Sequence, residues 1–200
     1  MKHLYLMRHG QTLYNTKHYV QGHCDSPLTE AGKGQADAAA AWFVAHDVKP
    51  ERIITSPLGR AVETARRVAS ALKIVGISLP PVEPCDGIIE RSYGSLEAGP
   101  AANVPCDLWD PGEEVVKYGG EGSRALRSRM VSTLTDAMDE TPDTLLAISH
   151  GSASLQFLKS VMEQEGRQAP AKLPNCAIVH FTYNESTKQF SLVEIADPAA

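Results

Sequence analysis

Two histidines directly follow short apolar segments, and each is followed by a glycine. His9 comes after residues 4–8, and His150 comes after residues 144–149. A neutral histidine is a competent nucleophile, and its ring nitrogens also donate and accept protons. Because ligands bind beyond the carboxyl ends of parallel strands, we expect both imidazoles to face one site there.

Two arginines and one glutamate accompany the histidines. Arg8 adjoins His9, and Arg60 falls near the start of a predicted helix. Arginine recognises phosphate oxygens through two parallel hydrogen bonds, and a helix N-terminus adds N–H donors. Glu90 follows two isoleucines, which would shield its carboxyl group from water, as suits a general acid. This set predicts phosphoryl transfer, which asks mainly for positioning and charge neutralisation and needs no metal here.

The segments that carry these residues resemble, in order along the chain, the motifs of the histidine phosphatase superfamily, also called the phosphoglycerate mutase-like family. Residues 6–12 (Leu-Met-Arg-His-Gly-Gln-Thr), with Asn15, look like its signature. The further matches are residues 21–22 and 25–29 (second phosphate-loop segment), 56–65 (S-x-L-x-R-A-x-x-T-A), 90–99 (E-x-x-x-G-x-x-E-G), 149–151 (second histidine) and 174–177 (late loop). Together they span nearly the whole chain.

The resemblance implies a role for each candidate residue. His9 would be the nucleophile that becomes phosphohistidine, and Glu90 the proton donor and later the base that activates water. The phosphoryl group would be held or bordered by Arg8, Arg60, Asn15, Gln21, Gly22, His150 and Gly151. The partner implied is a small phosphorylated substrate, with no cofactor. One departure is Ala98, inserted where the family commonly has Glu-Gly, which leaves the local loop shape unassigned.

The same residues can serve two reactions. If water attacks the phosphohistidine, the enzyme is a phosphatase; if the bound product attacks again, it is a phosphoglycerate mutase, which implies a bisphosphoglycerate primer. Residues 91–120 form the predicted variable lid that decides between them. A mutase must hold a carboxylate, yet this segment offers Arg91 and Lys117 against five acidic residues. We therefore expect a phosphatase, with the mutase as the alternative. A non-catalytic binding protein is disfavoured because the nucleophile, both arginines and the acid are all present.

Two other patterns are rejected. Cys85 to Arg91, followed by Ser92, has the C-x5-R-S spacing of cysteine-dependent phosphatases. Two carboxylates between them would repel a phosphate, and a thiolate nucleophile needs an electropositive loop. Residues 32–34 (Gly-Lys-Gly) lack the following Ser or Thr of a nucleotide loop and fall inside a predicted helix.

These residues must be positioned by alternating strands and helices. We predict strands at 4–7, 52–56, about 82–85, 144–149, 176–183 and 190–195, and helices at 29–46, 58–73, 123–139 and 151–165. Residues 10–28 read as a polar loop. Strands separated by helices require crossovers, which predicts a three-layer α/β/α sandwich with a mostly parallel sheet. A short turn joins the last two strands, so one strand should be antiparallel.

Composition narrows the function classes further. The chain has 200 residues, a size that predicts a single domain, and a formal net charge of -5. The acidic balance argues against nucleic acid or an anionic membrane as the main partner. No apolar window reaches the length of about 20 residues that a membrane span requires. Four scattered cysteines and the absence of a signal-peptide pattern predict free thiols in the cytoplasm. Apolar residues on an edge strand leave a homodimer open.

Overall fold

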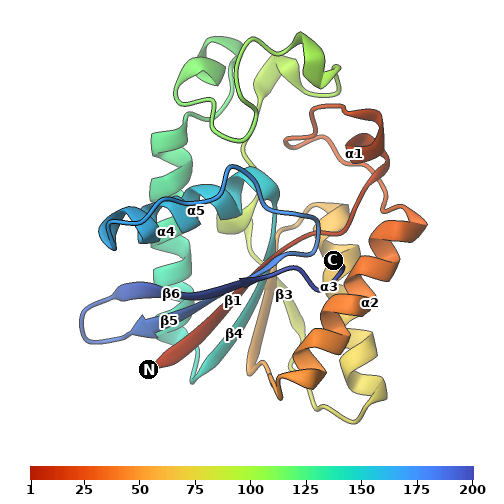
Figure 1. The fold of residues 1–200 in the computed structure, drawn as a ribbon, viewed down its shortest axis with the longest axis vertical. Coiled ribbons are helices and arrows are strands. Elements are labelled where there is room, and N and C mark those ends of the chain that lie inside the picture. The colour runs from red at the N-terminus through yellow and green to blue at the C-terminus, as the bar shows by residue number, and fades with distance from the viewer.

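The computed structural model describes residues 1–200 and contains a six-stranded sheet between two layers of helices (Figure 1). The strands lie in the order β3-β2-β4-β1-β5-β6. Their bounds are β1 (Lys2–Arg8), β2 (Arg52–Thr55), β3 (Val82–Pro84), β4 (Thr144–Ser149), β5 (Ile178–Asn184) and β6 (Gln189–Ala196). Strand β5 runs antiparallel to both β1 and β6, and the other pairs are parallel. The predicted fold class is therefore confirmed.

Helices cover both faces of the sheet. Their bounds are α2 (Glu30–Ala45) and α3 (Gly59–Ile74) on one face, and α4 (Ser123–Glu140) and α5 (Gly151–Gln164) on the other (Figure 1). Thr29 caps α2 as predicted, because its side chain accepts the Gly32 N–H. A further short helix, α1 (Leu13–Lys17), lies in the segment predicted as loop. Its cause is a capping box, in which the side chains of Thr12 and Asn15 bond each other's backbone N–H groups.

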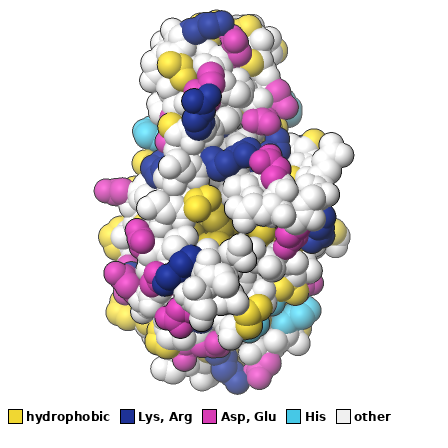
Figure 2. Space-filling model, turned by 90° about the vertical axis from the view of Figure 1, so that its left-hand side faces the viewer, with side chains coloured by type: hydrophobic (Ala, Val, Ile, Leu, Met, Phe, Trp, Pro, Cys, Tyr) yellow, Lys and Arg dark blue, Asp and Glu magenta, His cyan; other side chains and the backbone are white.

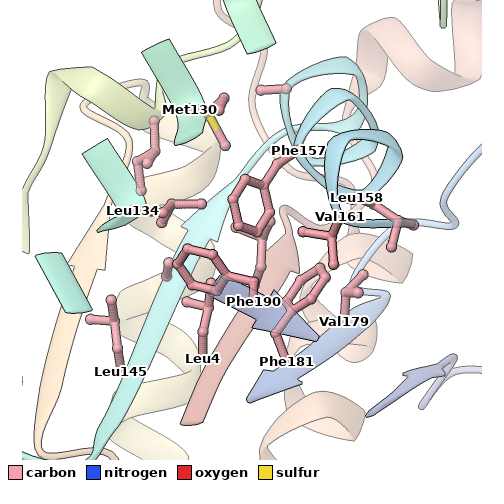
Figure 3. Packing of buried hydrophobic residues seen from close by; sticks show 14 of the residues in the cluster. Leu4, Met130, Leu134, Leu145, Phe157, Leu158, Val161, Val179, Phe181 and Phe190 are labelled. Carbon is pink, nitrogen blue, oxygen red and sulfur yellow. The ribbon is translucent and has the colours of Figure 1, made fainter. Parts of the chain in front are cut away.

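The core has two parts, one on each face of the sheet. In β1, Leu4 and Leu6 join the cluster under α4 and α5, whereas Tyr5 and Met7 join the cluster under α2 and α3. Figure 3 shows the first cluster, in which three phenylalanines meet edge to face. Burial on both faces holds the central strands rigidly, and with them the loops that leave their carboxyl ends.

Strands β1 and β4 are neighbours, and Arg8 is the register partner of Ser149. The two predicted histidines therefore leave the sheet at the same level. The His9 N–H continues the ladder by donating to the Ser149 carbonyl at 3.0 Å. The predicted meeting of the two strand ends is thus produced by parallel pairing in register.

Residues 91–120 lie above this end of the sheet and contain three short 3-10 helices, η2 (Gly94–Leu96), η3 (Ala101–Asn103) and η4 (Glu114–Tyr118) (Figure 1). A fourth, η1 (Asp86–Ile88), precedes them. The segment is tied to the loop before Gln21 by a short backbone ribbon. Val20 donates its N–H to Gly99 at 2.9 Å, and Ala98 donates to Val20 at 2.9 Å. This pairing brings residues 91–120 next to the loop that carries Gln21 and Gly22.

Ala98, the inserted residue, takes part in this backbone pairing through its N–H group. Ala98 has a φ of 60°, a left-handed conformation that costs an L-residue with a side chain roughly 1 kcal/mol. We expect Ala98→Gly to raise the free energy of unfolding by roughly 0.5–1 kcal/mol, as measured by urea denaturation. Ala125→Gly, in the exposed surface of α4, is the matched control and should lower stability by a similar amount. Equal destabilisation by both variants would contradict this account.

The outer edge of the sheet is formed by β6, where Val193 and Ile195 are exposed. An extra residue at Val193 shifts the pairing with β5 and forms a β-bulge. The N–H of Leu192 donates to a carboxylate oxygen of Glu165 at 3.0 Å rather than to a strand. One ladder donor of this edge is therefore already occupied.

Acidic and basic side chains are interspersed over the face of the molecule seen in Figure 2, with hydrophobic side chains in a central hollow. All four cysteines are free. No helix combines the length and the hydropathy that crossing a membrane would require.

Candidate active site

The two strand-end histidines lie against each other beneath residues 91–120. The ring centroids of His9 and His150 are 5.2 Å apart, and both rings are almost fully buried. His9 Nδ1 lies 2.7 Å from the Gly10 carbonyl oxygen. Because a carbonyl only accepts, Nδ1 must carry the proton, and a neutral His9 presents its Nε2 lone pair. This is the tautomer that a nitrogen nucleophile needs.

Both imidazoles are held in the neutral form. Burial lowers the pKa of His9 well below 6.5, and the nearby cations Arg60 and Arg8 lower it further. The pKa of His150 is lowered by burial first, and then by Arg60, His9 and Arg8. The His9 lone pair is therefore available at neutral pH.

His150 is fixed through one ring nitrogen and leaves the other free. Its Nε2 lies 2.6 Å from the Ser56 hydroxyl oxygen. When that hydroxyl donates to Nε2, a neutral His150 carries its proton on Nδ1. Nδ1 is buried and has no hydrogen-bond partner in the protein. Buried polar atoms without partners are rare, so this nitrogen points to a ligand group.

Arg8 is anchored at one end and capped by an aromatic ring. One terminal nitrogen donates to the Leu173 carbonyl at 2.7 Å, and the guanidinium carbon lies 5.0 Å from the centre of the Trp109 ring. Burial lowers the pKa of Arg8 to about 10, so the side chain stays charged at neutral pH. Its Nε is buried without a partner.

Arg60, at the start of α3, holds the loop that contains Gly22. Its two terminal nitrogens donate to the carbonyls of Gly22 at 2.7 Å and Cys24 at 2.9 Å. Asp25 accepts a further bond at 3.0 Å. The Nε atom of Arg60 is buried and, like that of Arg8, has no partner. Burial lowers the Arg60 pKa, while Glu90 and Asp25 act against that shift.

Asn15 and Gln21 line the same cavity, and their amide oxygens are bonded within the protein. The Asn15 oxygen accepts from the Thr12 N–H and from Asn175, and the Gln21 oxygen accepts from the Thr12 hydroxyl. With their oxygens engaged, both amides have NH2 donors left for an anion. Gly22 also lines the cavity and has a φ of 55°, which favours glycine.

Glu90 reaches the site from the loop after η1. Its carboxylate accepts backbone N–H groups of Arg91 at 2.8 Å, Ala153 at 2.9 Å and Ser152 at 3.2 Å. Two of these donors belong to the first turn of α5, so the helix N-terminus holds the group in place. Glu90 is 7% exposed, as its apolar neighbours predict.

A single cavity of about 120 Å³ connects these groups. It is lined by Arg8, His9, Asn15, Tyr19, Val20, Gln21, Gly22, Arg60, Glu90, Tyr93, Leu108, Trp109, Gly151 and Ser152. All predicted site residues line it except His150, whose ring packs edge-on against that of His9. The sequence did not single out Tyr19, Val20 or Ser152, although Val20 and Ser152 adjoin predicted site residues and Tyr19 lies two positions before Gln21.

The structure also accounts for the rejected patterns. Cys85 lies outside the cavity, at the end of β3. Arg91, counted above as a cation of the lid, is fully buried and donates to Ser152, Ser123 and the Glu121 carbonyl. It is therefore not part of the cavity lining, and Lys117 is the other of the two lid cations counted from the sequence.

Gly32 of the rejected Gly-Lys-Gly pattern has a packing role. A Cβ on Gly32 would lie 2.1 Å from the Gln11 carbonyl oxygen, and one on Gly10 would lie 2.4 Å from that of Gly32. Glycine at both positions lets α2 approach the loop that follows His9. No group of three or more His, Cys, Asp or Glu side chains is arranged to hold a metal ion.

This geometry agrees with the comparison to known proteins. The family model of the histidine phosphatase superfamily (branch 1) matches residues 4–196. The chain belongs to the histidine phosphatase superfamily. A curated relative in Yersinia pestis (strain Pestoides F), named probable phosphoglycerate mutase GpmB, is 31% identical in an alignment 203 residues long that covers 93% of this chain and 87% of the relative.

Two solved structures share the fold. Bacillus stearothermophilus YhfR has a TM-score of 0.82 at 22% identity, with 96% of each chain covered. A phosphoserine phosphatase mutant from Entamoeba histolytica, in complex with phosphoserine, has a TM-score of 0.78 at 22% identity, with 99% of this chain and 98% of that chain covered. The proteins similar to this chain thus include one named a probable mutase and one named a phosphatase.

The two neutral histidines make stability depend on pH. A histidine titrates near 6.5 when unfolded, and both have a lower pKa when folded. Below about pH 6.5 the unfolded chain binds more protons, so the free energy of unfolding should fall toward acid, by at most about 1.4 kcal/mol per pH unit for each histidine. Urea unfolding between about pH 7 and about pH 5 measures the slope. His150→Gln, which does not titrate, should flatten it; an unchanged slope would contradict the assignment.

Proposed function

We propose that the protein is a phosphomonoester hydrolase that works through a phosphohistidine on His9. The observation that carries the proposal is the set of three buried nitrogens without protein partners, Arg8 Nε, Arg60 Nε and His150 Nδ1. They belong to the two cations and the second imidazole that surround His9. Donors of this kind, held in place before the substrate arrives, suit the equatorial oxygens of a phosphoryl group.

In the first step, His9 Nε2 attacks phosphorus, the N–P bond forms and the bond to the leaving oxygen breaks. Glu90, in its protonated form, gives its proton to that oxygen, so the alcohol leaves neutral. Arg8, Arg60 and the Asn15 and Gln21 amides hold the phosphoryl oxygens. The arginine charges offset the negative charge that the group carries throughout.

In the second step, water attacks the phosphohistidine and the electron pair of the N–P bond returns to His9. The Glu90 carboxylate takes the proton of the attacking water. Inorganic phosphate leaves, and both residues are restored. The three backbone N–H groups bonded to the Glu90 carboxylate hold it in place through both steps.

We propose that residues 91–120 act as the lid over the leaving group. They contribute Tyr93, Leu108 and Trp109 to the cavity, beside Tyr19 and Val20. The cations of the lining are Arg8 and Arg60, and we assign both to the phosphoryl group. Lys117 of the lid is ion-paired with Glu114 at 2.6 Å. A lining of this kind favours an uncharged alcohol over a phosphoglycerate carboxylate, which supports hydrolysis.

The alternative is phosphoglycerate mutase activity, which the name of the Yersinia pestis relative favours. Both reactions use the same phosphohistidine and differ in whether water or the product attacks it. Phosphorus NMR separates them, with 3-phosphoglycerate and phenyl phosphate as substrates. We expect inorganic phosphate to form from phenyl phosphate and no 2-phosphoglycerate to form from 3-phosphoglycerate. Rapid formation of 2-phosphoglycerate would establish the mutase instead.

A further inference from the structure

Glu97 hydrogen-bonds to two loops that line the cavity, although its own side chain lies outside the lining. One carboxylate oxygen accepts the Cys24 N–H at 2.9 Å. The other accepts the Tyr93 N–H at 2.9 Å and lies 3.4 Å from the Ser92 hydroxyl oxygen. A single carboxylate thus connects segments about 70 residues apart in sequence.

The first of these loops, which contains Gly22 and Cys24, fixes the position of the Arg60 side chain. The carbonyls of Gly22 and Cys24 accept both of its terminal nitrogens, and Gly22 itself lines the cavity. A shift of this loop would therefore turn the Arg60 guanidinium and the Nε that we assign to the phosphoryl group.

The second loop carries Glu90 and Tyr93. It is joined to the first loop again through His23, whose Nε2 lies 2.9 Å from the Glu90 carbonyl oxygen. The contact between the two loops, made by Glu97 and His23, is called the loop junction here. It sets the distance between Arg60, which holds the phosphoryl group, and Glu90, which gives the proton.

The loop junction is tightly packed. A Cβ on Gly22 would lie 2.2 Å from a Glu97 carboxylate oxygen, so the turn at Gly22 has no room for another residue. Burial alone would raise the pKa of Glu97, but the N–H donors of Tyr93, His23 and Cys24 outweigh it and lower that pKa. The side chain is therefore ionised at neutral pH and accepts at both oxygens.

We propose that Glu97 is a positioning residue, which fixes Glu90 relative to the Arg60-bound phosphoryl group through its bonds to Cys24 and Tyr93. The inference rests on the proposed phosphatase reaction. It gives Glu97 a part in proton transfer to the leaving group, although it touches neither substrate nor reacting atom.

Glu97→Gln tests this with little change in shape. Both oxygens accept backbone N–H groups, so either orientation of the amide puts an NH2 group against an N–H donor. Glu97→Asp keeps the charge but is one methylene too short to reach both loops, and serves as the second variant should the first fail to fold. Glu140→Gln, on an exposed side chain at the end of α4, is the matched control.

The readout is the ratio of kcat/KM for 4-nitrophenyl phosphate to kcat/KM for phenyl phosphate. The nitrophenolate leaves without a proton, whereas phenolate needs one from Glu90. We expect Glu97→Gln to slow phenyl phosphate more and to raise this ratio roughly tenfold. Glu97→Asp should raise it too, and Glu140→Gln should leave it unchanged. An equal slowing of both esters, with a lower melting temperature, would mean a merely structural role and overturn the proposal.

Binding of inorganic vanadate, followed by calorimetry, needs no turnover and keeps the two proposals separate. If the wild type binds vanadate but releases no phosphate from either ester, the proposed function fails. Glu97 is then judged by vanadate affinity alone, which should fall roughly tenfold in Glu97→Gln because Arg60 turns. Unchanged affinity would overturn the positioning role.

Discussion

Replacing His9 with alanine should abolish phosphate release, with a fall in kcat of roughly 10⁴-fold or more. The variant lacks His9 Nε2, the one nitrogen with a free lone pair beside the Arg8 and Arg60 cations of the cavity. It retains Arg8, Arg60 and His150, so we expect inorganic phosphate to bind within roughly tenfold of the wild type. A loss of turnover without loss of binding is what separates a nucleophile from a phosphate ligand.

The intermediate itself gives a second readout. Rapid acid-free quenching of the wild type with labelled phenyl phosphate should trap a phosphoenzyme that is stable in base and labile in acid, and His9→Ala should trap none. Cys85→Ser is the control, because that thiol has the spacing of a nucleophile but lies outside the cavity. Loss of activity in Cys85→Ser, with activity retained in His9→Ala, would reverse the mechanism.

Arg60→Ala should lower kcat/KM by roughly 10³-fold. The change removes one donor to the phosphoryl group and also the bonds to Gly22, Cys24 and Asp25 that shape the neighbouring loop. Each hydrogen bond to a charged group contributes about 1.5–3 kcal/mol, so two or three of them account for this loss. Steady-state kinetics with phenyl phosphate measures it.

The control lies on the same helix. Arg67 also forms an ion pair, with Asp37 at 2.6 Å, but both partners are substantially exposed. Exposed pairs contribute about 0–1 kcal/mol, so Arg67→Ala should leave kcat/KM unchanged and stability nearly so. If the two arginine variants lost activity equally, a general effect on α3 would explain both losses. That result would contradict the role of Arg60 in binding the phosphoryl group.

Much of the fold follows from local patterns that tertiary packing does not override. Short sequence segments are enough to predict the strand ends before His9 and His150 and the helix cap at Thr29. Local patterns do not predict in which direction a long side chain points. Arg91 reads as a cation of the lid, yet it turns inward because Ser152 and Ser123 offer it hydrogen bonds.

The walls of the site depend on contacts between distant segments. Trp109 covers Arg8 although about 100 residues separate them, and no periodicity marks that pair. Gly32 is explained only by the backbone of Gln11 against it. Ordered motifs locate the reacting groups well, whereas the surface that the leaving group meets is built by loops whose course the sequence does not specify.

The bulge at Val193 also bears on how the molecule behaves when it is crowded. A long free strand is a template on which other chains can add, and this is a common route to fibrils. Here the kink interrupts the hydrogen-bond spacing, and Glu165 already occupies the Leu192 N–H. A charged residue, Glu194, stands in the same stretch. An incoming strand could not pair along this edge without breaking those contacts, so the bulge and Glu165 hinder edge-to-edge polymerisation at β6 in spite of its exposed apolar side chains.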